Sequence, residues 1–207
     1  MKVKALLFDT RSIQKYIFSG NKLKTNIGAS FLVDQLFSKF LVEDILQKEL
    51  NYVSDVNEWK NSNENSIKYG KILANEIEYL INQDKKVHIY AHSLGTNLIK
   101  YSLLELANKN ISIEKVHLFG GATSHSDVYE WKHTSEIVKY GIHNFYSQKD
   151  SVLKYLYKTF ELGDNPIGLN PISSNSKNIK NYDVSYTVKG HFEYKKNLQT
   201  ILKNLEL

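Results

Sequence analysis

The stretch that decides the fold is VHIYAHSLGTNLIKYSLLELA, residues 87–107. Its first six residues form a short run rich in branched and aromatic side chains, which is typical of a buried strand. From residue 94 to residue 107, leucine and isoleucine recur at helical spacing, so this part predicts a helix with one buried face. A strand that leads directly into a helix is the repeating unit of α/β proteins.

The same alternation runs through the rest of the chain. Short apolar runs predict further strands at residues 3–8, 116–119, 142–146 and 182–188, and a short one at 51–55. Helical spacing predicts helices at 13–18, 29–48, 67–81, 127–138, 151–160 and 193–205, while polar stretches at 57–65 and 163–178 predict loops. Parallel strands need a crossover that helices supply, so we expect an α/β fold with a mostly parallel sheet flanked by helices.

Length and composition favour one folded unit. The chain has 207 residues, of which 42% are hydrophobic, enough for one sizeable core, so we expect a single domain over residues 1–207. It contains no cysteine, which excludes disulfides, thiolate zinc sites and a cysteine nucleophile. The histidines show no metal-site spacing, and we expect neither a metal nor another cofactor.

The charge distribution indicates which classes of binding partner to expect. The formal net charge is +5, but it comes almost entirely from lysine, and Arg11 is the only arginine. Arginine supplies the bidentate contacts to phosphates and bases, so this composition argues against nucleic acid and indicates a solvated surface. The apolar run in residues 1–9 is too short for a signal peptide or a transmembrane segment, which favours a cytoplasmic protein.

The sequence AHSLG, residues 91–95, stands where the strand ends and the helix begins. This is the setting of a nucleophile elbow, in which a strained serine projects its hydroxyl above the sheet and small residues lie two positions before and after it. Ala91 and Gly95 are small, so Ser93 is predicted to be a nucleophile, with the backbone N–H of Leu94 as an oxyanion donor. The alternative is that Ser93 only caps the helix.

A serine nucleophile needs a base and an acid that orients it, and in this kind of fold both follow the serine in the order acid, then histidine. Asp150 comes just after the strand at 142–146, and His191 comes after the last expected strand. We therefore predict Asp150 as the acid and His191 as the base. Asp150 could instead cap a helix and His191 could be a packing residue; the other candidate acids are Asp127 and, more weakly, Asp164 and Asp183.

From about residue 59 to the end, the chain resembles a lipase-like α/β-hydrolase family of largely uncharacterised enzymes. The resemblance rests on AHSLG at 91–95, LFGGA at 118–122, NFYSQKD at 144–150 and GHFEY at 190–194. It implies a hydrolase core over residues 59–207 that acts on a small-molecule ester or lipid. It fixes neither the substrate nor the oligomeric state.

Residues 1–46 resemble something else. FDTRSIQKYIF at 8–18, NKLK at 21–24 and IGAS at 27–30 are similar to the start of the palm domain in the large polymerase-like subunit of type III CRISPR effectors. That family binds nucleotides and, in its active members, makes cyclic oligoadenylates with metal ions. The acidic Gly-Gly-Asp-Asp hairpin that holds those metals is absent here, so we expect the segment to supply a strand and a helix to the hydrolase sheet, unless the chain is chimaeric or truncated.

Two questions stay open from sequence alone. The second oxyanion donor has no recognisable motif, and the turn at residues 9–11 could provide it only if the strand at 3–8 lies beside the nucleophile strand. The function also has alternatives: a nucleotide-binding or CRISPR-effector-associated protein with an incomplete palm domain, or a catalytically inactive α/β scaffold.

Overall fold

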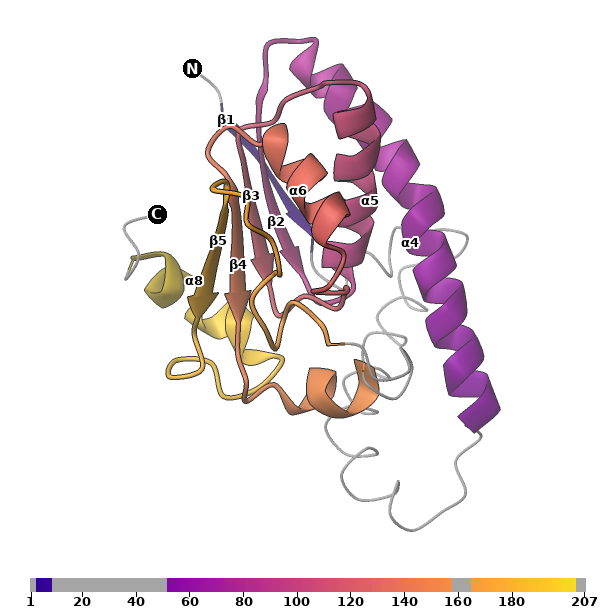
Figure 1. Ribbon diagram of the computed structural model, residues 1–207, viewed down its shortest axis with the longest axis vertical. Coiled ribbons are helices and arrows are strands. Elements are labelled where there is room, and N and C mark those ends of the chain that lie inside the picture. The colour runs from indigo at the N-terminus through magenta and orange to yellow at the C-terminus, as the bar shows by residue number, and fades with distance from the viewer. Residues whose placement is uncertain (1–2, 9–51, 158–164, 204–207) are drawn as a thin grey trace.

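A computed structural model of the chain describes residues 3–8, 52–157 and 165–203 (Figure 1). Its centre is a parallel five-stranded sheet in the order β1-β2-β3-β4-β5. The strands are β1 (Val3–Phe8), β2 (Lys86–His92), β3 (Lys115–Phe119), β4 (Ile142–Tyr146) and β5 (Ile179–Asp183). Helices connect them, so the predicted α/β fold with a parallel sheet is confirmed, and all carboxyl ends meet at one edge.

Helices lie on both faces of this sheet. The helices are α4 (Tyr52–Ile81), α5 (Gly95–Asn108), α6 (Val128–Glu136) and α8 (Glu193–Lys203), with a single π-helical turn η2 (Leu153–Tyr157) after β4. Side chains alternate between the faces of a strand. Leu118 therefore packs into the core under α4, α5 and α6, whereas its neighbour Phe119 packs into the core under α8.

The helix α4 packs closely along α5, as Figure 1 shows. Ser66, Gly70 and Ala74 are buried and recur every four residues on α4, so they form a stripe of small side chains on one face. A Cβ added to Gly70 would lie 2.7 Å from the Cβ of Tyr101 and 3.0 Å from the backbone oxygen of Leu98, both in α5. The glycine therefore allows the two helices to approach.

The α8 face of the sheet carries an aromatic ladder. The rings of Tyr90, Phe119, Phe145 and Tyr182, one from each of β2 to β5, stack with interplanar angles of 7 to 14°. His117 packs edge-on against Tyr90, with ring centroids 4.6 Å apart, and is buried among these rings. Four neighbouring parallel strands thus present aromatic side chains on one face, and those of β3, β4 and β5 are register partners.

Two expectations about element positions were wrong. Residues 51–55 and 57–65 were expected as a strand and a loop, but α4 runs through them from residue 52. Asparagine and serine cost a helix only tenths of a kcal/mol each relative to better helix formers, and extending an existing helix carries no nucleation cost, so polarity did not exclude helix.

The last strand was also misplaced. It was expected at residues 182–188, but β5 occupies Ile179–Asp183, where Ile179 pairs with Ile142 and Asp183 with Tyr146. Val184 and Val188 lie beyond it and pack into the core with α8. The expected helices at 13–18 and 29–48 lie outside the described residues.

Candidate active site

Ser93 occupies a sharp turn between β2 and α5 in a left-handed backbone conformation, with φ of +56°. A residue other than glycine pays of order 1–3 kcal/mol for such a conformation unless its surroundings impose it. Here the Ser93 N–H donates to the Phe119 carbonyl at 3.1 Å, and the Ser93 carbonyl accepts the Ala122 N–H at 3.1 Å. The Thr96 hydroxyl also donates to the Ser93 carbonyl at 2.7 Å, so both peptide groups of the turn are held.

Small residues surround this turn. A Cβ on Gly121 would lie 2.5 Å from the Ile167 side chain and 2.9 Å from the Thr96 hydroxyl. Gly120 has φ of +50°, and a Cβ there would lie 2.6 Å from the ring of Tyr194. The Gly-Gly pair after β3 therefore lets that loop and Tyr194 pack against the serine turn.

The structure brings the three predicted side chains into one hydrogen-bonded chain. The Ser93 Oγ lies 2.8 Å from His191 Nε2, and His191 Nδ1 lies 2.7 Å from Asp150 Oδ2. A carboxylate can only accept, so Nδ1 donates to Asp150 and Nε2 is left to accept the serine proton. The relative exposures are 8% for Ser93, 5% for His191 and 0% for Asp150. Bulk water is therefore largely kept from all three groups.

Asp150 performs two tasks with its two oxygens. While Oδ2 accepts from His191, Oδ1 accepts the N–H of Leu153 at 3.0 Å in the following helical turn. The cap role that the sequence offered as an alternative is thus present together with the histidine contact. Because both oxygens are engaged, the carboxylate has one orientation, and it fixes the ring of His191 in turn.

The loops that carry the acid and the histidine are joined directly. Ser147, at the end of β4, donates its hydroxyl to the Val188 carbonyl at 2.7 Å. The N–H of Gln148 donates to the Ser185 hydroxyl at 2.9 Å. These bonds tie the segment that precedes Asp150 to the segment that precedes His191, and neither was evident from the sequence.

His92 contacts His191, and Tyr194 contacts His92 in turn. The Nε2 of His92 lies 3.0 Å from the backbone carbonyl of His191 and donates to it, and the two imidazole rings are 4.7 Å apart. Tyr194 lies 5.6 Å from the His92 ring. Burial, together with the charge of Asp150, raises the pKa of Tyr194 well above its usual value, so its phenol stays neutral beside the acid.

The predicted oxyanion donor lies at the start of α5. Leu94 is the residue before the first turn of that helix, where backbone N–H groups have no partner within the helix. The strand β1 pairs with β2, and Phe8 lies opposite Ala91, so the N-terminal strand does lie beside the nucleophile strand. Residues 9–11, named as a possible second donor, lie outside the described residues.

The other candidate acids either make different contacts or lie outside the described residues. Asp127 binds Lys100, which also contacts Glu130 at 2.5 Å. Burial lowers the pKa of Lys100, but the hydrogen bonds to these two carboxylates outweigh it and raise that pKa overall. Asp183 accepts the N–H of Ser185 at 2.9 Å, and Asp164 lies outside the described residues.

The described part of the chain holds no cluster of three or more histidines or carboxylates arranged for a metal ion. Nor does any helix within residues 52–157 and 165–203 have both the length and the apolar character needed to cross a bilayer.

The chain belongs to the family described as Protein of unknown function (DUF726), which matches residues 43–207. This match begins after most of the segment that resembles a CRISPR palm domain, and that resemblance stays a prediction. No solved structure matches the chain.

Among curated proteins, the chain is 31% identical over 150 residues to "Uncharacterized membrane protein F35D11.3" of Caenorhabditis elegans, covering 70% of this chain and 24% of that protein. It is 32% identical over 149 residues to "Uncharacterized membrane protein C6F6.13c" of Schizosaccharomyces pombe, covering 71% and 26%. It is 29% identical over 160 residues to "Probable lipase MIL1" of Saccharomyces cerevisiae, covering 76% and 15%. The chain thus spans about a quarter or less of the length of these relatives.

Proposed function

We propose that this member of the DUF726 family is a serine hydrolase that cleaves carboxylic esters, lipids among them. The observation that carries the proposal is the chain from Ser93 Oγ through His191 to Asp150, with links of 2.8 and 2.7 Å, at a serine held in a left-handed turn. A serine that merely capped a helix would need neither a histidine nor a buried carboxylate behind it. One relative named a probable lipase adds support for an ester of a lipid.

In the acylation step, His191 Nε2 takes the hydroxyl proton while Ser93 Oγ attacks the ester carbonyl carbon. The new C–O bond converts the carbonyl into an oxyanion, which the Leu94 N–H and the positive end of the α5 dipole stabilise. Asp150 stabilises the imidazolium through Nδ1–H. The C–O bond to the alcohol then breaks, and the imidazolium returns its proton to the departing alkoxide.

Deacylation repeats the sequence with water. His191 removes a proton from the water as its oxygen attacks the acyl carbon, and the acid leaves as Ser93 regains its proton. Water is the only co-reactant in this scheme. The left-handed turn serves it by holding Ser93 Oγ beside His191 Nε2.

Kinetics of short, soluble p-nitrophenyl esters test the proposal. Members of one catalytic unit are non-additive, so Ser93→Ala and His191→Ala should each lower kcat about as far as the double variant does. Thermal melts of each variant show whether it is folded. Turnover that survives in folded Ser93→Ala, or single losses that simply multiply in the double variant, would refute the proposed unit.

A further inference from the structure

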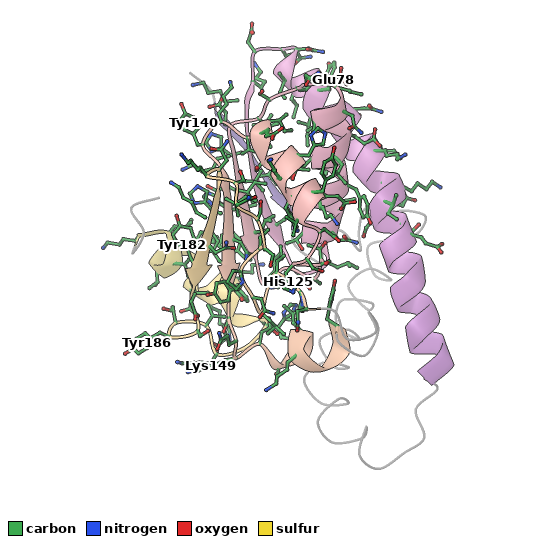
Figure 2. All side chains as sticks on the ribbon, viewed as in Figure 1. Glu78, His125, Tyr140, Lys149, Tyr182 and Tyr186 are labelled. Carbon is green, nitrogen blue, oxygen red and sulfur yellow. The ribbon has the colours of Figure 1, made fainter. Side chains whose placement is uncertain are left out.

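Four side chains form an exposed rim beside His191, and we call it the rim: Lys149, Tyr186, Lys189 and Phe192. Tyr186 is 91% exposed and Phe192 is 39% exposed, although both are large aromatic residues. Figure 2 labels Lys149 and Tyr186 near each other at the edge where the strands end, with Tyr140 at the opposite end of the molecule. The Phe192 ring contacts the His191 ring with centroids 5.4 Å apart, so exposed apolar surface lies directly beside the buried serine and histidine, which is typical of a surface that binds a partner.

The rim is held in place by bonds between two loops. Gln148 N–H donates to the Ser185 hydroxyl at 2.9 Å. Lys149 follows Gln148 and Tyr186 follows Ser185, so this bond holds the backbone next to both rim residues. The Nζ of Lys189 donates to the Ser185 carbonyl at 3.2 Å and lies 5.1 Å from the centroid of the Tyr186 ring. Lys189, from the same loop, therefore restricts the ring of Tyr186, so Tyr186 loses less conformational entropy when a partner covers it.

The charge of the rim is positive and locally crowded. Lys149 and Lys189 are both exposed cations of the rim, and the ammonium group of Lys149 lowers the pKa of Lys189. Glu193, at the start of α8, accepts the backbone N–H of Lys189 at 2.6 Å, and its charge raises the pKa of Lys189 by less than Lys149 lowers it. Two ammonium groups in one rim gain most from an anionic partner that lies across both.

We propose that the rim docks this protein on an anionic lipid surface, with the tyrosine and phenylalanine in the headgroup region and the two lysines on acidic headgroups. Tyrosine is favoured at this boundary because it offers an apolar ring and a polar tip. The same carboxyl edge carries Ser93 and His191, so docking would bring lipid esters to the reactive hydroxyl. The idea that docking delivers lipid esters to Ser93 rests on the proposed function, whereas docking on the lipid surface does not.

The test measures vesicle binding in a Ser93→Ala background, where no lipid can be consumed. Co-sedimentation compares vesicles of phosphatidylcholine alone with vesicles of equal parts phosphatidylcholine and phosphatidylglycerol. We expect binding to the anionic vesicles that weakens as salt rises. A lysine near an acidic membrane contributes about fivefold in binding, so Lys149→Gln/Lys189→Gln should lower the partition coefficient about 25-fold. Tyr186→Ser should lower it several-fold.

Matched controls come from the opposite edge of the sheet. Tyr140 is also an exposed tyrosine, and Lys177 and Lys180 are exposed lysines at the start of β5. Tyr140→Ser and Lys177→Gln/Lys180→Gln should bind anionic vesicles as the parent does. All of these side chains are on the surface, and melts of each variant verify the fold.

Three results would overturn the docking surface: no binding to either vesicle, equal binding to both, or rim variants that bind as well as their controls. Absence of vesicle binding with an intact rim would leave a protein partner as the occupant. Because the binding assay uses Ser93→Ala, its failure leaves the hydrolase proposal untouched. Conversely, salt-sensitive docking without any ester turnover by the unmutated protein would refute only the hydrolase.

Discussion

His117 makes the stability of the fold sensitive to acid. Its side chain is 2% exposed in the middle of the sheet, and neither ring nitrogen has a hydrogen-bond partner among the described residues. Burial, with smaller contributions from the positive charges of His143, Lys115 and His88, lowers the pKa of His117 from 6.5 to about 3. The native protein therefore keeps this ring neutral at pH values where an unfolded chain would protonate it.

The sign and size of the effect follow from proton linkage. The stabilisation is complete above the unfolded pKa of 6.5 and is lost as pH falls, because the unfolded state then binds the extra proton. At pH 5 the free energy of unfolding should be lower than at pH 7.5 by about 2 kcal/mol from this residue alone. The loss should reach about 4 kcal/mol at pH 3.

Urea denaturation at pH 7.5 and pH 5 measures this loss, with His117→Leu as the comparison. Leucine fills the site without a buried polar group left unpaired, so the variant should be at least as stable at pH 7.5 and should lose about 2 kcal/mol less on going to pH 5. Between pH 7.5 and pH 9 the ring is neutral in both states, and the two proteins should change in parallel. Equal losses at pH 5 in wild type and variant would show that His117 can be protonated in place.

Three further predictions concern the site and the core. Asp150→Asn should lower kcat on short esters by about 10²- to 10⁴-fold, whereas Asp127→Asn should be nearly silent, and the reverse order would move the acid to the other loop. Thr96→Val should lower the free energy of unfolding by about 1 kcal/mol in urea, because it removes the hydroxyl that donates to the Ser93 carbonyl; Thr96→Ser keeps the donor, and equal losses in both would discount that bond. Gly70→Ala should cost about 1–3 kcal/mol in a thermal melt, since its Cβ would lie 2.7 Å from that of Tyr101, and an unchanged melt would mean that α4 and α5 can separate freely.

Local sequence patterns predicted those parts of the molecule that depend on neighbouring residues. The strand, turn and helix around Ser93 follow from periodicity in one continuous stretch, and so do β3 and β4. Asp150 could be chosen because strand ends in a parallel sheet share one edge, whereas His191 follows residues 184–190 and does not stand directly after β5. The order of elements therefore indicated the correct edge of the sheet, and the bonds between the loops before Asp150 and His191 complete the approach.

Long-range contacts decide what the sequence did not reveal. The start of β5 depends on its pairing with β4, and the apolar residues that suggested a strand at 182–188 instead pack under α8. The bond from His92 to the carbonyl of His191 joins residues 99 positions apart, and that from Ser147 to Val188 joins residues 41 apart. No local sequence pattern predicts either hydrogen bond, although the sequence does place His92 directly before Ser93.

The central claim is that His191 activates Ser93, and labelling with a fluorophosphonate tests it most directly. This reagent forms a covalent bond with a serine oxygen only where a base and an oxyanion site act on it. Peptide mass spectrometry should find the adduct on Ser93 in the wild-type protein, with labelling lost in Ser93→Ala and strongly slowed in folded His191→Ala. A wild-type protein that stays unlabelled, or a His191→Ala variant that labels at the wild-type rate, would contradict the claim.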